Sequence, residues 1–126
     1  MKTIGLFLVA ASLVWTSGCS KSDGGGDAVD PAAQAEAAKI FMERCATCHG
    51  NNGTGDGAGA AALNPKPRNF QDPAWQASVT DEHIENIIKV GGTGVGKSAA
   101  MPPNPDLAGK DAVVKALRAK VRSFKR

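Results

Sequence analysis

Residues 45 to 49 read Cys45-Ala46-Thr47-Cys48-His49, and this short stretch decides what the chain can fold around. Two thiols separated by two residues and followed directly by a histidine form the pattern for covalent haem attachment. On one helical turn both thiols can add to the vinyl groups of a single haem, and the neighbouring imidazole then lies under the iron as an axial ligand. The motif therefore predicts one covalently bound haem c, held by Cys45, Cys48 and His49.

Paired cysteines also occur in disulfides, in redox-active pairs and in zinc sites. Thioredoxin-like pairs open a helix inside a strand-rich fold, whereas Cys45 follows a helical pattern. A structural zinc site needs four ligands, and only His83 is left as a fourth. The sequence favours haem over these three alternatives.

The chain before the motif predicts a helix that carries Cys45 to the haem edge. Residues 32–38 are rich in alanine, Pro31 suits a first helical turn, and Asp30 is a favourable cap. Met42 lies on the same helix and is expected to pack in the core.

The first eighteen residues have the layout of a secretory signal peptide, and their apolar run is shorter than the ~20 residues of a membrane span. Cys19 follows small residues and resembles the lipobox cysteine of bacterial lipoproteins, whose thiol is acylated. Thr16 replaces the usual leucine, so cleavage by the ordinary signal peptidase is the alternative. Ser20, where an aspartate would favour retention in the inner membrane, points towards the outer membrane.

Three segments follow from this layout. Residues 1–18 are the signal peptide, residues 19–30 hold the anchor cysteine and a glycine-rich flexible linker, and residues 31–126 form one domain. We expect this domain on the periplasmic side of a bacterial membrane, lipid-anchored through Cys19, or soluble in the periplasm if Cys19 is not acylated.

Three features give residues 32–124 a resemblance to the class I c-type cytochromes, the small monohaem cytochromes c. They are the haem motif, the proline-containing loop at residues 64–70, and the Met101-Pro102 pair late in the chain. The resemblance implies an all-α cytochrome c fold, with three to four helices around one haem.

The resemblance also assigns a role to the loop at residues 64–70. In that family a proline carbonyl of the first long loop accepts a hydrogen bond from the proximal imidazole and fixes the ring. Pro65 and Pro67 are both candidates for the acceptor from His49. Together with Arg68 they complete the predicted cofactor-binding set.

A methionine should be the sixth iron ligand, as the resemblance implies, and Met101 is the candidate. It is the one methionine expected outside both the leader and the core, and Pro102 and Pro103 stiffen its loop. The rival ligand is His83. It lies in the first turn of a helix capped by Thr80, where a surface position is expected.

Residues 91–98 match the phosphate-binding pattern G-x-x-x-x-G-K-[ST] letter for letter. That motif must follow a strand and open a helix whose amino end faces the phosphates. The isoleucines before Gly91 have helical spacing, and the prolines after Met101 interrupt any later helix. We therefore expect a helix stop at Gly91, a loop leading to Met101, and no nucleotide site.

Residues 111–124 predict a last helix that packs across the first one, with an apolar stripe of Val114, Leu117 and Val121. Its basic residues are expected to face outward: Lys115, Arg118, Lys120 and Arg122. The family often has an aromatic residue where Lys120 stands, so Phe41 or Phe124 is expected to supply the ring.

Charge is unevenly distributed along the chain. Residues 110–126 hold seven basic residues and one acid, whereas residues 19–109 hold seven basic and eleven acidic. A basic face can steer an acidic partner, and an ordinary solvated helix face is the alternative. No aromatic residues interleave with these charges, so nucleic-acid binding is not expected.

A haem iron with both axial positions filled offers no place for a substrate. The predicted function is therefore single-electron transfer rather than catalysis, with respiratory complexes or other exported oxidoreductases as redox partners. The alternative is a haem-based catalytic or sensing protein in which Met101 leaves the sixth position open.

Overall fold

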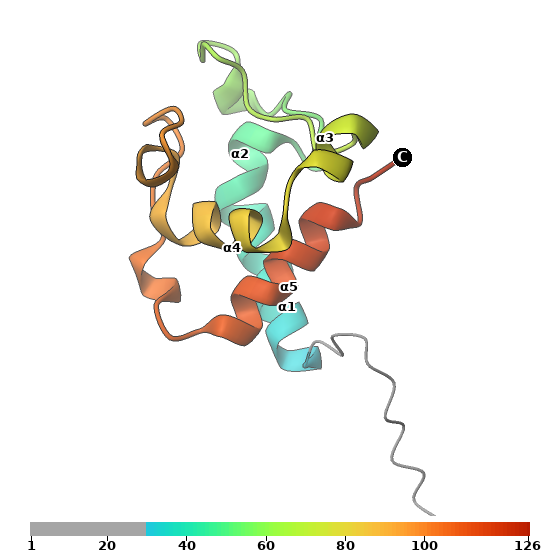
Figure 1. The fold of residues 1–126 in the computed structure, drawn as a ribbon, viewed down its shortest axis with the longest axis vertical. Coiled ribbons are helices and arrows are strands. Elements are labelled where there is room, and N and C mark those ends of the chain that lie inside the picture. The colour runs from blue at the N-terminus through green and yellow to red at the C-terminus, as the bar shows by residue number, and fades with distance from the viewer. Residues whose placement is uncertain (1–29) are drawn as a thin grey trace, which may run out of the picture.

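The computed structural model describes residues 30–126, and its regular structure in this range is entirely helical (Figure 1). The elements, in chain order, are α1 (Pro31–Ile40), the π-helix η1 (Phe41–Cys45), α2 (Ala46–His49), the 3-10 helix η2 (Ala58–Ala60), α3 (Pro73–Ser78), α4 (Asp81–Val90), the 3-10 helices η3 (Thr93–Val95) and η4 (Pro105–Leu107), and α5 (Asp111–Arg122). The all-α fold class is confirmed. Because α1, η1 and α2 are continuous, the described part contains four separate α-helical segments, as predicted. The signal peptide and Cys19 lie outside the described residues.

The first helix begins as the sequence predicts and runs on to the end of the haem motif. The Asp30 carboxylate accepts hydrogen bonds from the backbone N–H groups of Ala32 and Ala33, and Pro31 occupies the first turn. The helix widens to a π-turn at η1, which ends at Cys45. Such π-turns inside α-helices are frequent at functional sites.

The first and last helices pack across each other and supply most of the core (Figure 1). The predicted stripe of α5 is buried, with Val114 and Leu117 almost fully enclosed. Phe41 and Phe124 contact each other with ring centroids 5.3 Å apart, and the Lys120 ammonium lies over both rings. Both phenylalanines therefore supply the aromatic contact expected beside Lys120.

The prediction that Met42 packs in the core is wrong. Its side chain is 53% exposed, whereas the adjacent Phe41 is 1% exposed. Neighbouring residues of a helix point in different directions, and Phe41 takes the position that faces α5.

The prediction that Arg118 and Arg122 face solvent is also wrong. Both bind Asp81 at the start of α4, and Arg118 Nε lies 3.2 Å from the Glu85 carboxylate. Arg122 also donates to the backbone oxygens of Gln76 and Val79, each at 2.7 Å. These two arginines join α5 to α4 and to the end of α3. Because both guanidinium groups are paired within the fold, fewer basic side chains of α5 face solvent than the sequence indicates.

Among residues 30–126, no helix combines the length and the apolarity needed to cross a bilayer.

Asp81 makes the stability of this junction depend on pH. Burial works against its ionised form, but hydrogen bonds from Arg122 and Arg118 hold its pKa below the ordinary value. A carboxyl group with a lowered folded-state pKa stabilises the fold above its unfolded pKa, about 3.9, and this contribution is lost as pH falls through the folded-state value.

We predict that Asp81→Asn lowers the thermal stability at neutral pH and that the difference from the unmutated protein narrows as the pH falls below the unfolded-state pKa of about 3.9. Thermal unfolding followed by circular dichroism across this range measures it. Glu82→Gln, on the exposed side of the same first turn, is the control and should change little. A difference between Asp81→Asn and the unmutated protein that stays constant with pH would contradict the assignment.

Candidate functional site

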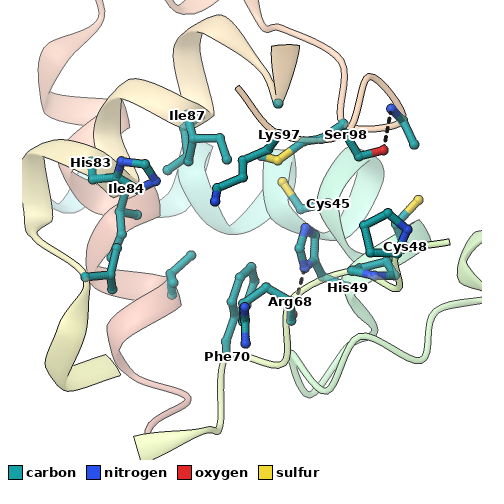
Figure 2. A pocket seen from close by; sticks show the side chains of 18 of the residues that line it. Cys45, Cys48, His49, Arg68, Phe70, His83, Ile84, Ile87, Lys97 and Ser98 are labelled. Carbon is teal, nitrogen blue, oxygen red and sulfur yellow. Dashed lines mark hydrogen bonds between the residues drawn. The ribbon is translucent and has the colours of Figure 1, made fainter. Parts of the chain in front are cut away.

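A cavity of about 1000 Å³ opens between the end of the first helix, α4 and the loops at residues 63–70 and 92–104 (Figure 2). Its size is at the upper end of the roughly 300–1,000 Å³ typical of ligand sites. The structure brings the predicted cofactor-binding residues together on its wall: Cys45, Cys48, His49, Pro65, Pro67, Arg68 and Met101.

The two thiols come from consecutive turns of the continuous first helix. Cys45 ends η1, Cys48 belongs to α2, and both are free and half-buried. Burial raises the pKa of the Cys45 thiol to about 11, so this thiol is protonated at neutral pH. A redox-active pair would need a lowered thiol pKa, and the structure gives the opposite shift at Cys45.

The described residues do not form a zinc site of the kind that cysteine, histidine and carboxylate side chains build. Within the range described, no three Cys, His, Asp or Glu residues gather closely enough to hold a metal ion. His83, the remaining candidate for a fourth zinc ligand, is an exposed residue of α4.

The His49 ring is held from two sides. Its Nδ1 lies 3.2 Å from the carbonyl oxygen of Arg68, and its face stacks on Phe70 with ring centroids 4.3 Å apart (Figure 2). A carbonyl can only accept, so Nδ1 carries the hydrogen and Nε2 keeps a free lone pair. Burial lowers the pKa of His49, while the Arg68 carbonyl acts in the opposite direction. The ring is thus neutral and able to bind a metal through Nε2.

The expectation that Pro65 or Pro67 supplies this acceptor is wrong. The oxygen that pairs with His49 belongs to Arg68, the residue after Pro67. The Pro67 oxygen packs instead against Gly55, where a Cβ would lie only 2.5 Å from it. Both prolines still line the cavity, so they shape its wall without bonding the ring.

The glycine-rich loop after His49 folds back over the end of its own helix. The N–H of Gly55 donates to the His49 carbonyl at 2.8 Å, and the N–H of Gly57 donates to the Cys48 carbonyl at 3.1 Å. A Cβ on Gly57 would lie 2.3 Å from the Thr47 oxygen. The loop therefore requires glycine for backbone contact, and it satisfies carbonyls that a helix end leaves without partners.

The loop that carries Met101 is fastened to α4. The N–H of Gly92 donates to the Met101 carbonyl at 2.9 Å. Asn104 donates through its backbone N–H to Lys89 at 3.0 Å and through its side-chain amide to Ile88 at 2.8 Å. These bonds satisfy carbonyls in the last turn of α4 and hold the half-buried Met101 at the cavity.

Arg44 connects this loop to the haem motif. The residue directly before Cys45, it donates to the Asp106 carboxylate at 2.9 Å and to the Asn104 side-chain oxygen at 3.3 Å. Neither Arg44 nor Asn104 was singled out from the sequence. The only sequence signal for Asn104 was general: the last backbone carbonyls of a helix such as α4 need hydrogen-bond donors from outside that helix.

Gly91 ends α4 with a φ of 72°, which confirms the predicted helix stop. Thr80 caps the same helix by accepting from the N–H of His83, and His83 is exposed, as predicted, although it also lines the cavity. The phosphate-binding pattern at residues 91–98 follows a helix, and in the described chain no α-helix begins between its end and α5. The strand-loop-helix setting of a nucleotide site is not formed.

The cavity fits a haem by its chemistry. Much of its wall is apolar, and its polar lining includes four cationic side chains and no carboxylate; the cations are Arg44, Lys66, Arg68 and Lys97. Haem is a flat apolar macrocycle that carries two carboxylates. Such a group requires apolar walls, thiols beside an imidazole, and cations in a lining that contains no carboxylate.

Comparisons with known proteins agree with this chemistry. The cytochrome c family model matches residues 34–120. The solved structure of a protein described as KustC0563 c-type cytochrome is similar, with a TM-score of 0.54 and 34% sequence identity, over 71% of this chain and 98% of that one. None of the curated protein sequences matches significantly. With Cys45 and Cys48 at the attachment positions, the chain belongs to the cytochrome c family and binds haem c covalently.

Proposed function

We propose that the protein is a single-electron carrier whose haem iron is ligated by His49 and Met101. Cytochrome c domains typically carry electrons, which gives the general activity. One observation carries the finer proposal: the free Nε2 side of a neutral His49 and the half-buried Met101 line the same cavity.

When bound, the haem supplies an iron that takes one electron from a reduced donor protein and passes it to an oxidised acceptor, with no bond made or broken. The chain positions and insulates that iron. The Arg68 carbonyl fixes the tautomer of His49, and second-shell bonds of this kind tune the ligand. The apolar wall formed by Phe70, Ile84 and Ile88 keeps water away. A thioether ligand favours the reduced iron.

Met101 is a better sixth ligand than His83 because its loop is pinned. Backbone bonds hold it to Gly92, and Asn104 holds the following segment to α4. Among the described residues, none is hydrogen-bonded to the His83 ring, and His83 is exposed. A pinned ligand loses little conformational entropy on binding the iron.

The cellular setting is part of this proposal and depends on residues outside the described range. The leader and Cys19 support export to the periplasmic side of a bacterial membrane, with a lipid anchor and the linker as a tether. The electron donor and acceptor would then be respiratory complexes or other exported oxidoreductases. Cations left outside salt bridges in and beyond α5 can steer an acidic partner; they are Lys115, Lys120, Lys125 and Arg126.

We predict that Met101→Ala abolishes the far-red sulfur-to-iron band of the ferric protein and lowers the reduction potential, because the thioether is removed from the iron. Absorption spectra and a redox titration measure both. Met42→Ala, which removes an exposed methionine, is the control and should keep band and potential. An unmutated protein without the band would instead favour an open sixth position and a catalytic or sensing role.

We predict that Asn104→Ala lowers the free energy of unfolding by about 1–3 kcal/mol, because the Ile88 carbonyl loses its donor. Chemical denaturation of the haem-loaded protein measures it, and the far-red band should weaken as the loop loosens. Asn51→Ala, at an exposed loop position, should do neither. Equal stability of the two variants would contradict the role given to Asn104.

We predict that Cys19→Ser moves the protein from the membrane fraction to the soluble periplasmic fraction, because the acylated thiol is lost. Fractionation of cells that make each form, followed by haem staining, measures it. The unmutated protein in the soluble fraction would show that Cys19 is not acylated.

A further inference from the structure

Lys97 is the one charged residue of the false phosphate-binding pattern at residues 91–98, and it lines the cavity. It follows the 3-10 helix η3, and Figure 2 shows its side chain extending from the loop into the cavity. Within residues 30–126, its ammonium makes no salt bridge and no side-chain hydrogen bond. Lys97 is exposed as a residue, and its long cationic side chain borders both the solvent and the apolar cavity.

The other cations on the wall already have partners. Arg44 binds Asp106 at 2.9 Å, and Arg68 lies 3.8 Å from the Asp72 carboxylate. Lys66 donates to the carbonyls of Ala60 and Ala61 at 2.8 and 2.7 Å. Lys97 differs from these three cations because its ammonium has no such partner among the described residues. The cavity lining also contains no acidic side chain that could pair with it.

The chemistry of haem supplies the missing anion. The two vinyl groups lie on adjacent pyrrole rings, and the two propionates lie on the other two rings. With its vinyl groups attached at Cys45 and Cys48, the haem would carry its carboxylates on the edge away from these two thioether bonds. Figure 2 shows the Lys97 side chain between His83 and Cys45, with Cys48 on the far side of Cys45.

We propose that Lys97 is the cationic partner of a haem carboxylate and that this pair raises the reduction potential of the iron. The inference rests on the proposed electron-carrier function. Reduction adds one negative charge to the haem, so a fixed positive charge beside it favours the reduced form. A lysine in direct contact with a haem carboxylate is screened less by salt than charges separated by more than a Debye length, which is about 10 Å at 0.1 M salt.

The test compares Lys97→Met and Lys97→Arg with a matched control, Lys115→Met, which removes the same charge from an exposed position of α5. Each haem-loaded protein is titrated by spectroelectrochemistry at about 0.05 M and about 0.5 M salt. We expect Lys97→Met to shift the potential downward at both salt concentrations. Lys97→Arg should stay close to the unmutated value, and any shift in Lys115→Met should vanish at high salt.

A potential unchanged in Lys97→Met, or a shift that salt removes as fully as in the control, would overturn the pairing. If Lys97→Met loads haem poorly, Lys97→Gln gives the same comparison with a polar neutral side chain. Failure of the proposed function can be told apart from failure of this pairing. If the unmutated protein shows no reversible one-electron titration, the electron-carrier function is contradicted before any variant is compared.

Discussion

The hydrogen bond from His49 Nδ1 to the Arg68 carbonyl is the interaction on which the site depends. It joins the helix that carries both cysteines to the loop that forms the opposite wall, and Phe70 packs on the same ring. The bond sets the tautomer, and with it the nitrogen that faces the cavity. Without it the motif would still hold thiols, and Phe70 would still stack on the ring, but the tautomer of the imidazole would not be set.

The rest of the fold keeps the two walls of the cavity at a fixed separation. On one side Arg118 and Arg122 bind Asp81 and tie α5 to the start of α4. On the other side Arg44 and Asn104 tie the end of the first helix and the end of α4 to the loop around Met101. Polar junctions thus stand at both ends of α4, the helix that supplies much of the apolar wall.

The apparent nucleotide motif shows how one set of residues serves a different chemistry in a different setting. Glycine ends a helix at Gly91, and the loop then turns back to bond the Met101 carbonyl through Gly92. The lysine that would face phosphates after a strand faces a cavity without carboxylates here. The sequence pattern matches because both kinds of loop need glycines and a lysine. The element before the loop, a strand in a nucleotide site and a helix here, distinguishes them.

Short-range chemistry was readable from the sequence alone. The haem motif, the caps at Asp30 and Thr80 and the stop at Gly91 each depend on residues within one or two turns, so the pattern carries the information. The apolar spacing of α5 likewise predicted the burial of Val114, Leu117 and Val121, although Val113 and Ala116 are buried beside them.

Contacts between distant segments were decided only by the tertiary structure. The acceptor for His49 is the carbonyl of Arg68 rather than that of a proline, and the Pro67 oxygen lies against Gly55, in a loop that the chain folds back over the helix end. The partners of Arg118 and Arg122 lie on another helix. These hydrogen-bond and salt-bridge partners depend on which surfaces of the folded chain come into contact, and a local sequence pattern contains no information about that.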